Sequence, residues 1–176
     1  MYSKIFLNII LILSLVIIQL SFIAGLPAGL NYLNLILVIL IFILGLVNLN
    51  FAAWWTVGIG LLLDIFSFAP FGIYLFCLCL TIIIADFALT VFFTNRSLYS
   101  FLALVGLTTA VYEILLTAIG YLVWLISREG AGLILNQSFW LSKLSQMTLN
   151  LIAALIIFYF ISFVSKRLRP VFLARH

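Results

Sequence analysis

Apolar residues run through most of the chain with few interruptions, and the runs have helical length. Between Ile5 and Gln19 the only polar residues are Asn8 and Ser14. Strands of a membrane barrel would alternate polar and apolar residues over about ten positions. Because about 20 residues cross a bilayer as a helix, the pattern predicts an all-α transmembrane bundle of about six spans in a single domain. Their approximate ranges are 5–24, 31–47, 51–66, 70–93, 98–127 and 143–165.

The second and third spans are short and meet at Asn48-Leu49-Asn50. A single helix over residues 31–66 would be about 54 Å long at 1.5 Å per residue, which exceeds the thickness of a bilayer. A helical hairpin is therefore expected here. Trp54 and Trp55 follow the turn and are predicted to anchor it as interfacial aromatic residues.

Composition and charge agree with a membrane environment. Of the 176 residues, 68% are hydrophobic and 7% are charged, against about 25% charged in a soluble domain. Cytoplasmic flanks of membrane proteins carry an excess of Lys and Arg, and with six spans both termini share one side. That side carries the larger basic group, which predicts cytoplasmic termini. Its members are Lys4, Arg96, Lys166, Arg167, Arg169 and Arg175, and the other side has Arg128 and Lys143.

Three acidic residues fall within predicted spans. Glu113 lies about halfway along the fifth span, Asp86 lies inside the fourth, and Asp64 lies near the outer end of the third, where it is placed to cap the turn that follows. A charge in mid-bilayer costs roughly 2.5 to 3.5 kcal/mol, and none of the three has a basic residue three or four positions away. Each is therefore expected to be protonated, hydrogen-bonded to a neighbouring helix, or close to water.

Small and polar residues recur at helical spacing on five of the six spans. The third has Ala52, Thr56, Gly60 and Asp64; the fourth has Gly72, Cys79 and Asp86; the fifth has Gly106, Thr109, Glu113, Thr117 and Gly120; the sixth has Ser142, Gln146, Asn150 and Ala154; the first has Asn8 and Gln19. Such stripes let membrane helices approach closely. The second span has only Gly45 and is predicted to be the most exposed to lipid.

Two interpretations of these residues remain open. The stripes either serve helix packing alone or line a site for a ligand, ion or partner, with Glu113 the stronger site candidate because intramembrane carboxylates are often functional. The basic tail, Lys166, Arg167, Arg169 and Arg175, either anchors the topology or attracts anionic lipid or an acidic partner. The residues predicted to pack or bind inside the membrane are Asp86, Thr109, Glu113, Thr117, Gln146 and Asn150.

The sequence offers little for catalysis. The only histidine, His176, is the last residue, so a Ser-His pair within the membrane is excluded and zinc ligands are lacking. Cys77 and Cys79 sit two apart on nearly opposite helix faces and are expected to be core residues. No phosphate-binding glycine loop is present, and a net charge of +4 does not indicate nucleic-acid binding. We expect a non-enzymatic protein without a cofactor.

The segment from Val57 to Gly72, VGIGLLLDIFSFAPFG, is similar to the signature of the MreD family of bacterial rod shape-determining membrane proteins. In that family a glycine-rich span ends in Leu-Asp, and a short turn leads to a glycine that starts the next span. The motif covers about a tenth of the chain. Length, span count and cytoplasmic termini also fit. The uncharged turn at Asn48 to Asn50 departs from the family, where basic residues are expected.

The resemblance implies a multi-pass subunit of the cell-elongation machinery in the bacterial inner membrane. Such a subunit acts with MreC, the RodA and penicillin-binding synthases and, indirectly, the MreB filament, and it has no chemistry of its own. Gly60, Asp64, Pro70 and Gly72 match the family motif and would shape the turn between the third and fourth spans.

Two alternatives belong to other classes. Substrate-binding subunits of energy-coupling-factor vitamin transporters are also small six-span proteins, and the MreD fold looks related to theirs. Such a subunit needs a polar pocket near its outer face, and few outer residues are available to line one. They are Asp64, Ser67, Trp124, Asn136, Gln137 and Trp140. The other alternative is a bundle that only scaffolds another complex.

Overall fold

The computed structural model describes residues 2–27, 29–67, 69–92, 98–127 and 137–172, and this part of the chain is helical without strands. The helices are α1 (Tyr2–Ile17), α2 (Leu35–Leu46), α3 (Leu49–Phe66), α4 (Ile73–Val91), α5 (Leu98–Ser127) and α6 (Gln137–Phe172). A π-helical turn, η1 (Ile18–Ile23), continues α1, and a 3-10 turn, η2 (Leu30–Tyr32), precedes α2. The predicted helical bundle is confirmed, and the predicted fifth range coincides with α5.

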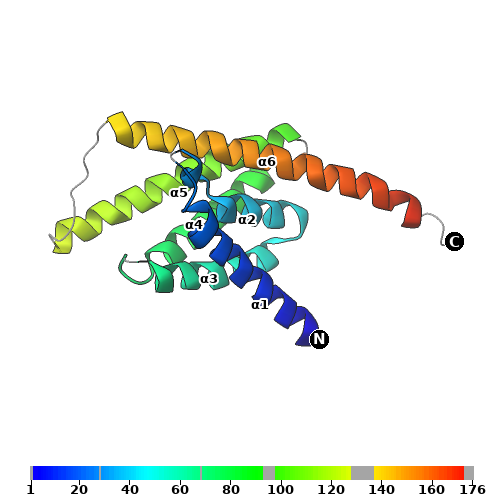
Figure 1. The fold of residues 1–176 in the computed structure, drawn as a ribbon, viewed down its shortest axis with the longest axis horizontal. Coiled ribbons are helices and arrows are strands. Elements are labelled where there is room, and N and C mark those ends of the chain that lie inside the picture. Colours follow the sequence, from blue (N-terminus) through cyan, green and yellow to red (C-terminus); the bar gives the residue numbers. More distant parts are fainter. Residues whose placement is uncertain (1, 28, 68, 93–97, 128–136, 173–176) are drawn as a thin grey trace.

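Successive helices run in opposite directions between the two ends of the bundle (Figure 1). At one end, the Gln19 side chain of η1 bonds to the backbone at the start of α2, and Asp64 of α3 bonds to the start of α4. We call this the Asp64 end. At the other end Gly45 of α2 lies against the Phe101 ring of α5. Helix α1 begins and α6 finishes at this second end, which we call the terminal end (Figure 1).

Helix α2 is the centre of the bundle, and its predicted exposure to lipid is wrong. Eight of its 12 residues are buried, Leu37, Val38, Leu40 and Ile41 completely, and it packs against α3, α4, α5 and α6. A helix that is apolar all round suits a protein core as well as lipid. At about 18 Å it is also too short to cross a hydrocarbon core of about 30 Å.

Five helices of the described chain are long and apolar enough to cross a membrane, one fewer than the six spans predicted, and α2 is a shorter apolar helix. The helices least buried by the rest of the protein are α1 and α6. Many large side chains of α1 face outward, including Phe6, Leu7 and Ile17. The last candidate span runs from Gln137 to Phe163. It therefore begins six residues earlier than the predicted range of 143–165.

The turn between α2 and α3 is confirmed, but one of its predicted interfacial anchors is not. The Asn48 side chain caps α3 by accepting a hydrogen bond of 2.8 Å from the Phe51 backbone N–H. Trp54 is 77% exposed, as an interfacial anchor requires, whereas Trp55 is buried within the core. Neighbouring residues on a helix point about 100° apart, so only one of the two rings faces outward.

Helices α3 and α4 form the most extensive helix pair of the bundle. The four-residue stripe predicted on α3 is buried in full, from Ala52 through Thr56 and Gly60 to Asp64. Gly60 marks the closest approach, because a Cβ atom there would stand 2.7 Å from the Leu75 Cα of α4. Small residues at such contacts allow two membrane helices to pack backbone to backbone.

We therefore expect Gly60→Ala to lower the free energy of unfolding by about 1 to 3 kcal/mol, the usual cost of overpacking. The added methyl would meet backbone of α4, which can yield only if the helices separate. Gly58→Ala is the matched control, since a Cβ there would meet the flexible end of Ile12 at 3.2 Å. Denaturant titration in a mild detergent measures both. Equal losses for the two variants would contradict the close-packing account.

Candidate functional site

Asp64 joins the end of α3 to the start of α4. Its side chain is almost completely buried, and its Oδ1 and Oδ2 accept hydrogen bonds from the backbone N–H groups of Tyr74 and Leu75, at 2.9 and 3.1 Å. The first N–H groups of a helix lack partners within the helix, and a carboxylate also suits the positive end of the helix dipole. Asp64 therefore caps the start of α4, the helix that follows the turn, and not the turn itself.

The other three motif residues lie around the same turn. Gly72 directly precedes α4 with φ of 100°, a conformation that glycine adopts without a Cβ clash. Pro70 is exposed within the turn. Gly60, Asp64 and Gly72 therefore all contribute to the α3–α4 hairpin. Gly60 allows the two helices to pack closely, Gly72 allows the chain to reverse, and Asp64 accepts hydrogen bonds from the amide groups at the start of α4.

Glu113 of α5 is held by two side chains of α6. Its Oε2 forms an ion pair with the Lys143 Nζ, and its Oε1 accepts a hydrogen bond of 2.5 Å from the Gln146 amide. The Glu113 and Lys143 side chains are 11% and 32% exposed. The sequence left three possibilities for Glu113: protonation, hydrogen bonding to a neighbouring helix, or proximity to water. In the structure Glu113 is hydrogen-bonded to the neighbouring helix α6.

Residue spacing along α5 does not predict Lys143 as the partner of Glu113, because such spacing reveals only partners on the same helix and Lys143 lies on α6. A signal existed in the sequence. Lys143, Gln146 and Asn150 follow one another at intervals of three and four, which places them on one helix face. That face packs on α5.

Asn150 and Gln19 complete the polar contacts of the Asp64 end. Asn150 is fully buried; its Nδ2 donates to the Thr109 hydroxyl at 3.1 Å and its Oδ1 accepts from the Asn34 backbone N–H at 2.9 Å. Gln19 donates to the Leu33 carbonyl at 2.8 Å and accepts from the Leu35 N–H at 3.0 Å. Together they fix the start of the buried helix α2 against α5, α6 and η1.

Of the remaining predicted residues, Thr117 contacts this group, whereas Asp86 lies apart from it. The Thr117 hydroxyl donates to the Glu113 backbone carbonyl at 2.7 Å. Asp86 is half-buried on α4, without a hydrogen-bond partner in the described part of the chain, and about 18 Å beyond Tyr74 along the helix axis. In the basic tail, Lys166, Arg167 and Arg169 lie in the last turns of α6, and Arg175 falls outside the described residues.

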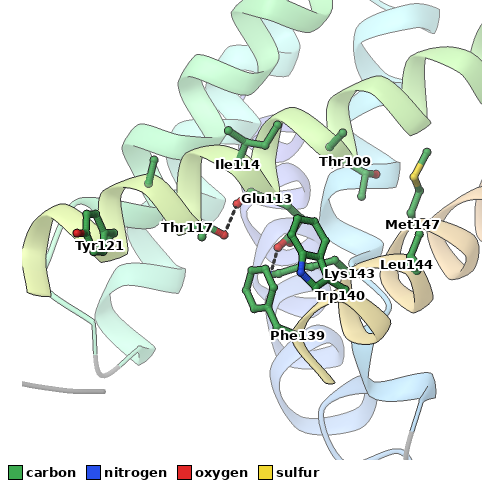
Figure 2. Close-up of a pocket in the computed structure, with 12 residues that line it drawn as sticks. Thr109, Glu113, Ile114, Thr117, Tyr121, Phe139, Trp140, Lys143, Leu144 and Met147 are labelled. Carbon is green, nitrogen blue, oxygen red and sulfur yellow. Dashed lines mark hydrogen bonds and ion pairs between the residues drawn. The ribbon is translucent and has the colours of Figure 1, made fainter. Parts of the chain in front are cut away.

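Three cavities surround the Glu113–Lys143 pair, each at the Asp64 end. A polar cavity of about 270 Å³ has Glu113, Gln146, Gln19, Tyr74 and Tyr112 among its lining residues. A cleft of about 420 Å³ is lined by Pro70, Trp124 and Lys143, among others. An apolar groove of about 530 Å³ lies between α5 and α6, with Glu113, Lys143, Phe139 and Trp140 around it (Figure 2). Glu113 borders the first and third, and Lys143 borders the second and third.

The residues proposed for an outer pocket are divided among these spaces. Ser67 lines the polar cavity, Trp124 the cleft and Trp140 the groove. Gln137 is the first residue of α6, and Asn136 lies outside the described residues. Cys77 is buried and Cys79 half-buried, and both are free thiols. Within the described ranges, no group of three His, Cys, Asp or Glu side chains is arranged to hold a metal ion.

Comparison with known proteins found no match to a family model, to a curated protein or to a solved structure.

Proposed function

We propose that this chain is a non-enzymatic membrane subunit of the bacterial cell-elongation machinery, similar to MreD. The observation that carries the proposal is the segment from Val57 to Gly72. Its distinctive residues have specific tasks in the turn: Gly60 admits the α4 backbone, Asp64 caps α4, and Gly72 supplies the positive φ. The residues that resemble the family signature are thus the ones on which this hairpin depends.

The arrangement of the helices supports the proposed orientation, with both termini in the cytoplasm. Helix α1 begins and α6 finishes at the same end of the bundle (Figure 1). Lys166, Arg167 and Arg169 occupy the last turns of α6, and basic residues favour the cytoplasmic side. We therefore assign the terminal end to the cytoplasm and the Asp64 end to the outer face.

On this proposal the partners are an MreC-like single-span protein, the RodA and penicillin-binding synthases and, through them, the MreB filament. The exposed apolar surfaces of α1 and α6 offer a second membrane helix ample contact area. We expect the tagged chain, extracted from membranes of its own bacterium in mild detergent, to retain an MreC-like protein at near-equal amounts.

Two variants test how this association depends on the motif. Asp64→Ala is expected to reduce the recovered partner more than Asp86→Ala, because Asp64 organises the α3–α4 turn whereas Asp86 has no bonding partner among the described residues. Partner amounts are to be normalised to the monodisperse fraction of each variant. Purification of the wild-type chain without an MreC-like protein counts against the proposal.

A second candidate is a substrate-binding subunit of an energy-coupling-factor transporter. It is favoured by the polar cavity of about 270 Å³, where Glu113, Gln146, Tyr74 and Tyr112 converge on space at the proposed outer face. This candidate predicts saturable binding of a water-soluble metabolite to the purified chain. A thermal-shift screen of vitamins without a stabilising compound argues against it.

A further inference from the structure

The apolar groove between α5 and α6 has the shape and lining of a site for hydrocarbon. Its volume is about 530 Å³, and apolar side chains form most of its wall (Figure 2). Ile114 and Leu144 are 66% and 60% exposed, so the groove opens sideways to the bilayer. Such a space accepts an acyl chain without loss of any polar contact.

The groove carries one ion pair, and the depth of that pair matches a lipid headgroup. Helix α4 has 19 residues and spans about 28 Å, close to the hydrocarbon thickness of about 30 Å, so its first residues lie near one boundary of the hydrocarbon. Tyr74 at the start of α4 lines the same cavity as Glu113. Trp140 and Tyr121 stand at the groove, as aromatic residues do at membrane interfaces.

Both members of the pair retain bonding capacity towards a ligand. The Lys143 ammonium has three donors and directs one at the Glu113 Oε2, while also lying 5.4 Å from the centre of the Phe139 ring. Each Glu113 carboxylate oxygen accepts one side-chain hydrogen bond and has a second lone pair available. A cation and an anion thus stand side by side at the groove, with a combined charge of zero.

We propose that this groove is a binding site for phosphatidylethanolamine from the surrounding bilayer. The lipid phosphate accepts hydrogen bonds from Lys143, the lipid ammonium donates to Glu113, and an acyl chain fills the space beside Leu144 and Met147. This inference is independent of the proposed role in cell elongation, since it requires only that the chain lies in a membrane.

Other common headgroups complement the pair less well. Phosphatidylglycerol carries a net negative charge, so Glu113 repels it while Lys143 attracts it. Phosphatidylcholine is zwitterionic, but its quaternary ammonium has no N–H to donate to the Glu113 carboxylate. Hydrogen bonds to charged groups are roughly twice as strong as those between neutral groups, so the loss of this one is large enough to measure.

The test is native mass spectrometry of the full-length protein, delipidated in detergent and then given three lipids with identical palmitoyl and oleoyl chains. We expect phosphatidylethanolamine to occupy the protein at least about tenfold more strongly than phosphatidylcholine or phosphatidylglycerol, as one charge-assisted hydrogen bond implies. Equal occupancy by the three lipids, or preference for phosphatidylglycerol, would overturn the proposal.

Variants then locate the site. Glu113→Gln is expected to abolish the preference for ethanolamine over choline, and Asp86→Asn, which changes a carboxylate remote from the groove, should leave it unchanged. Ala118→Phe fills the groove from its exposed wall and should weaken binding of all three lipids equally. If Glu113→Gln does not fold, the proposal is tested by the headgroup ranking of the wild-type protein and by the lipid occupancy of Ala118→Phe. Lipid occupancy in Ala118→Phe that equals the wild-type occupancy would refute this location.

Discussion

Glu113→Ala is expected to lower the free energy of unfolding by about 3 kcal/mol, the lower end of the cost of breaking a buried ion pair. The substitution leaves the Lys143 ammonium without its counter-ion and the Gln146 amide without its acceptor. We use the lower end of this range because the Lys143 side chain is 32% exposed, so its charge is not fully buried. Reversible unfolding in detergent, followed by tryptophan fluorescence, measures the loss.

The double variant Glu113→Gln/Lys143→Met is the control for this interpretation. It removes both charges while preserving the approximate volume of each side chain, and such replacement of a buried pair is often close to neutral. We expect it to be more stable than Glu113→Ala. If the double variant loses as much stability as Glu113→Ala, or more, an uncompensated Lys143 charge is not the cause of the loss in Glu113→Ala.

The second large effect is expected at Asp64. Asp64→Ala leaves the partly buried N–H groups of Tyr74 and Leu75 without acceptors. Each costs about 1 to 3 kcal/mol, so a total of roughly 3 kcal/mol is expected. Asp64→Asn keeps one acceptor oxygen and should lose about half as much. Amide hydrogen exchange should quicken at the start of α4 in both variants.

Asp86→Ala provides the matched comparison, because Asp86 lies in the same hairpin, is half-buried and has no hydrogen-bond partner among the described residues. We expect its unfolding free energy to change by less than about 1 kcal/mol. A larger loss for Asp86→Ala than for Asp64→Ala is incompatible with the capping role of Asp64.

Sequence reasoning predicted those features that depend on residue spacing along one helix. The length of the apolar run gives α5 its correct bounds. The interval of four on α3 places Thr56 and Asp64 on one face, and both are buried. The sequence predicts a turn at Asn48, and the Asn48 side chain caps α3.

The features that were missed depend on which helices are neighbours. An apolar helix looks the same whether lipid or protein surrounds it, so the sequence of α2 could not show that it occupies the core. Glu113 lies midway along α5 but near the Asp64 end of the bundle, because α5 has 30 residues and α4 only 19. The Glu113–Lys143 pair joins residues 30 positions apart, beyond any same-helix pattern.

The proposed function is tested most directly by depletion of this chain from the organism that carries it, with the length-to-width ratio of the cells as the measurement. The account predicts that the rods shorten and become round within a few generations, and that plasmid-borne wild-type chain or Asp86→Asn restores them whereas Asp64→Ala does not. Cells that keep their rod shape and growth rate after complete depletion would contradict a role in cell elongation.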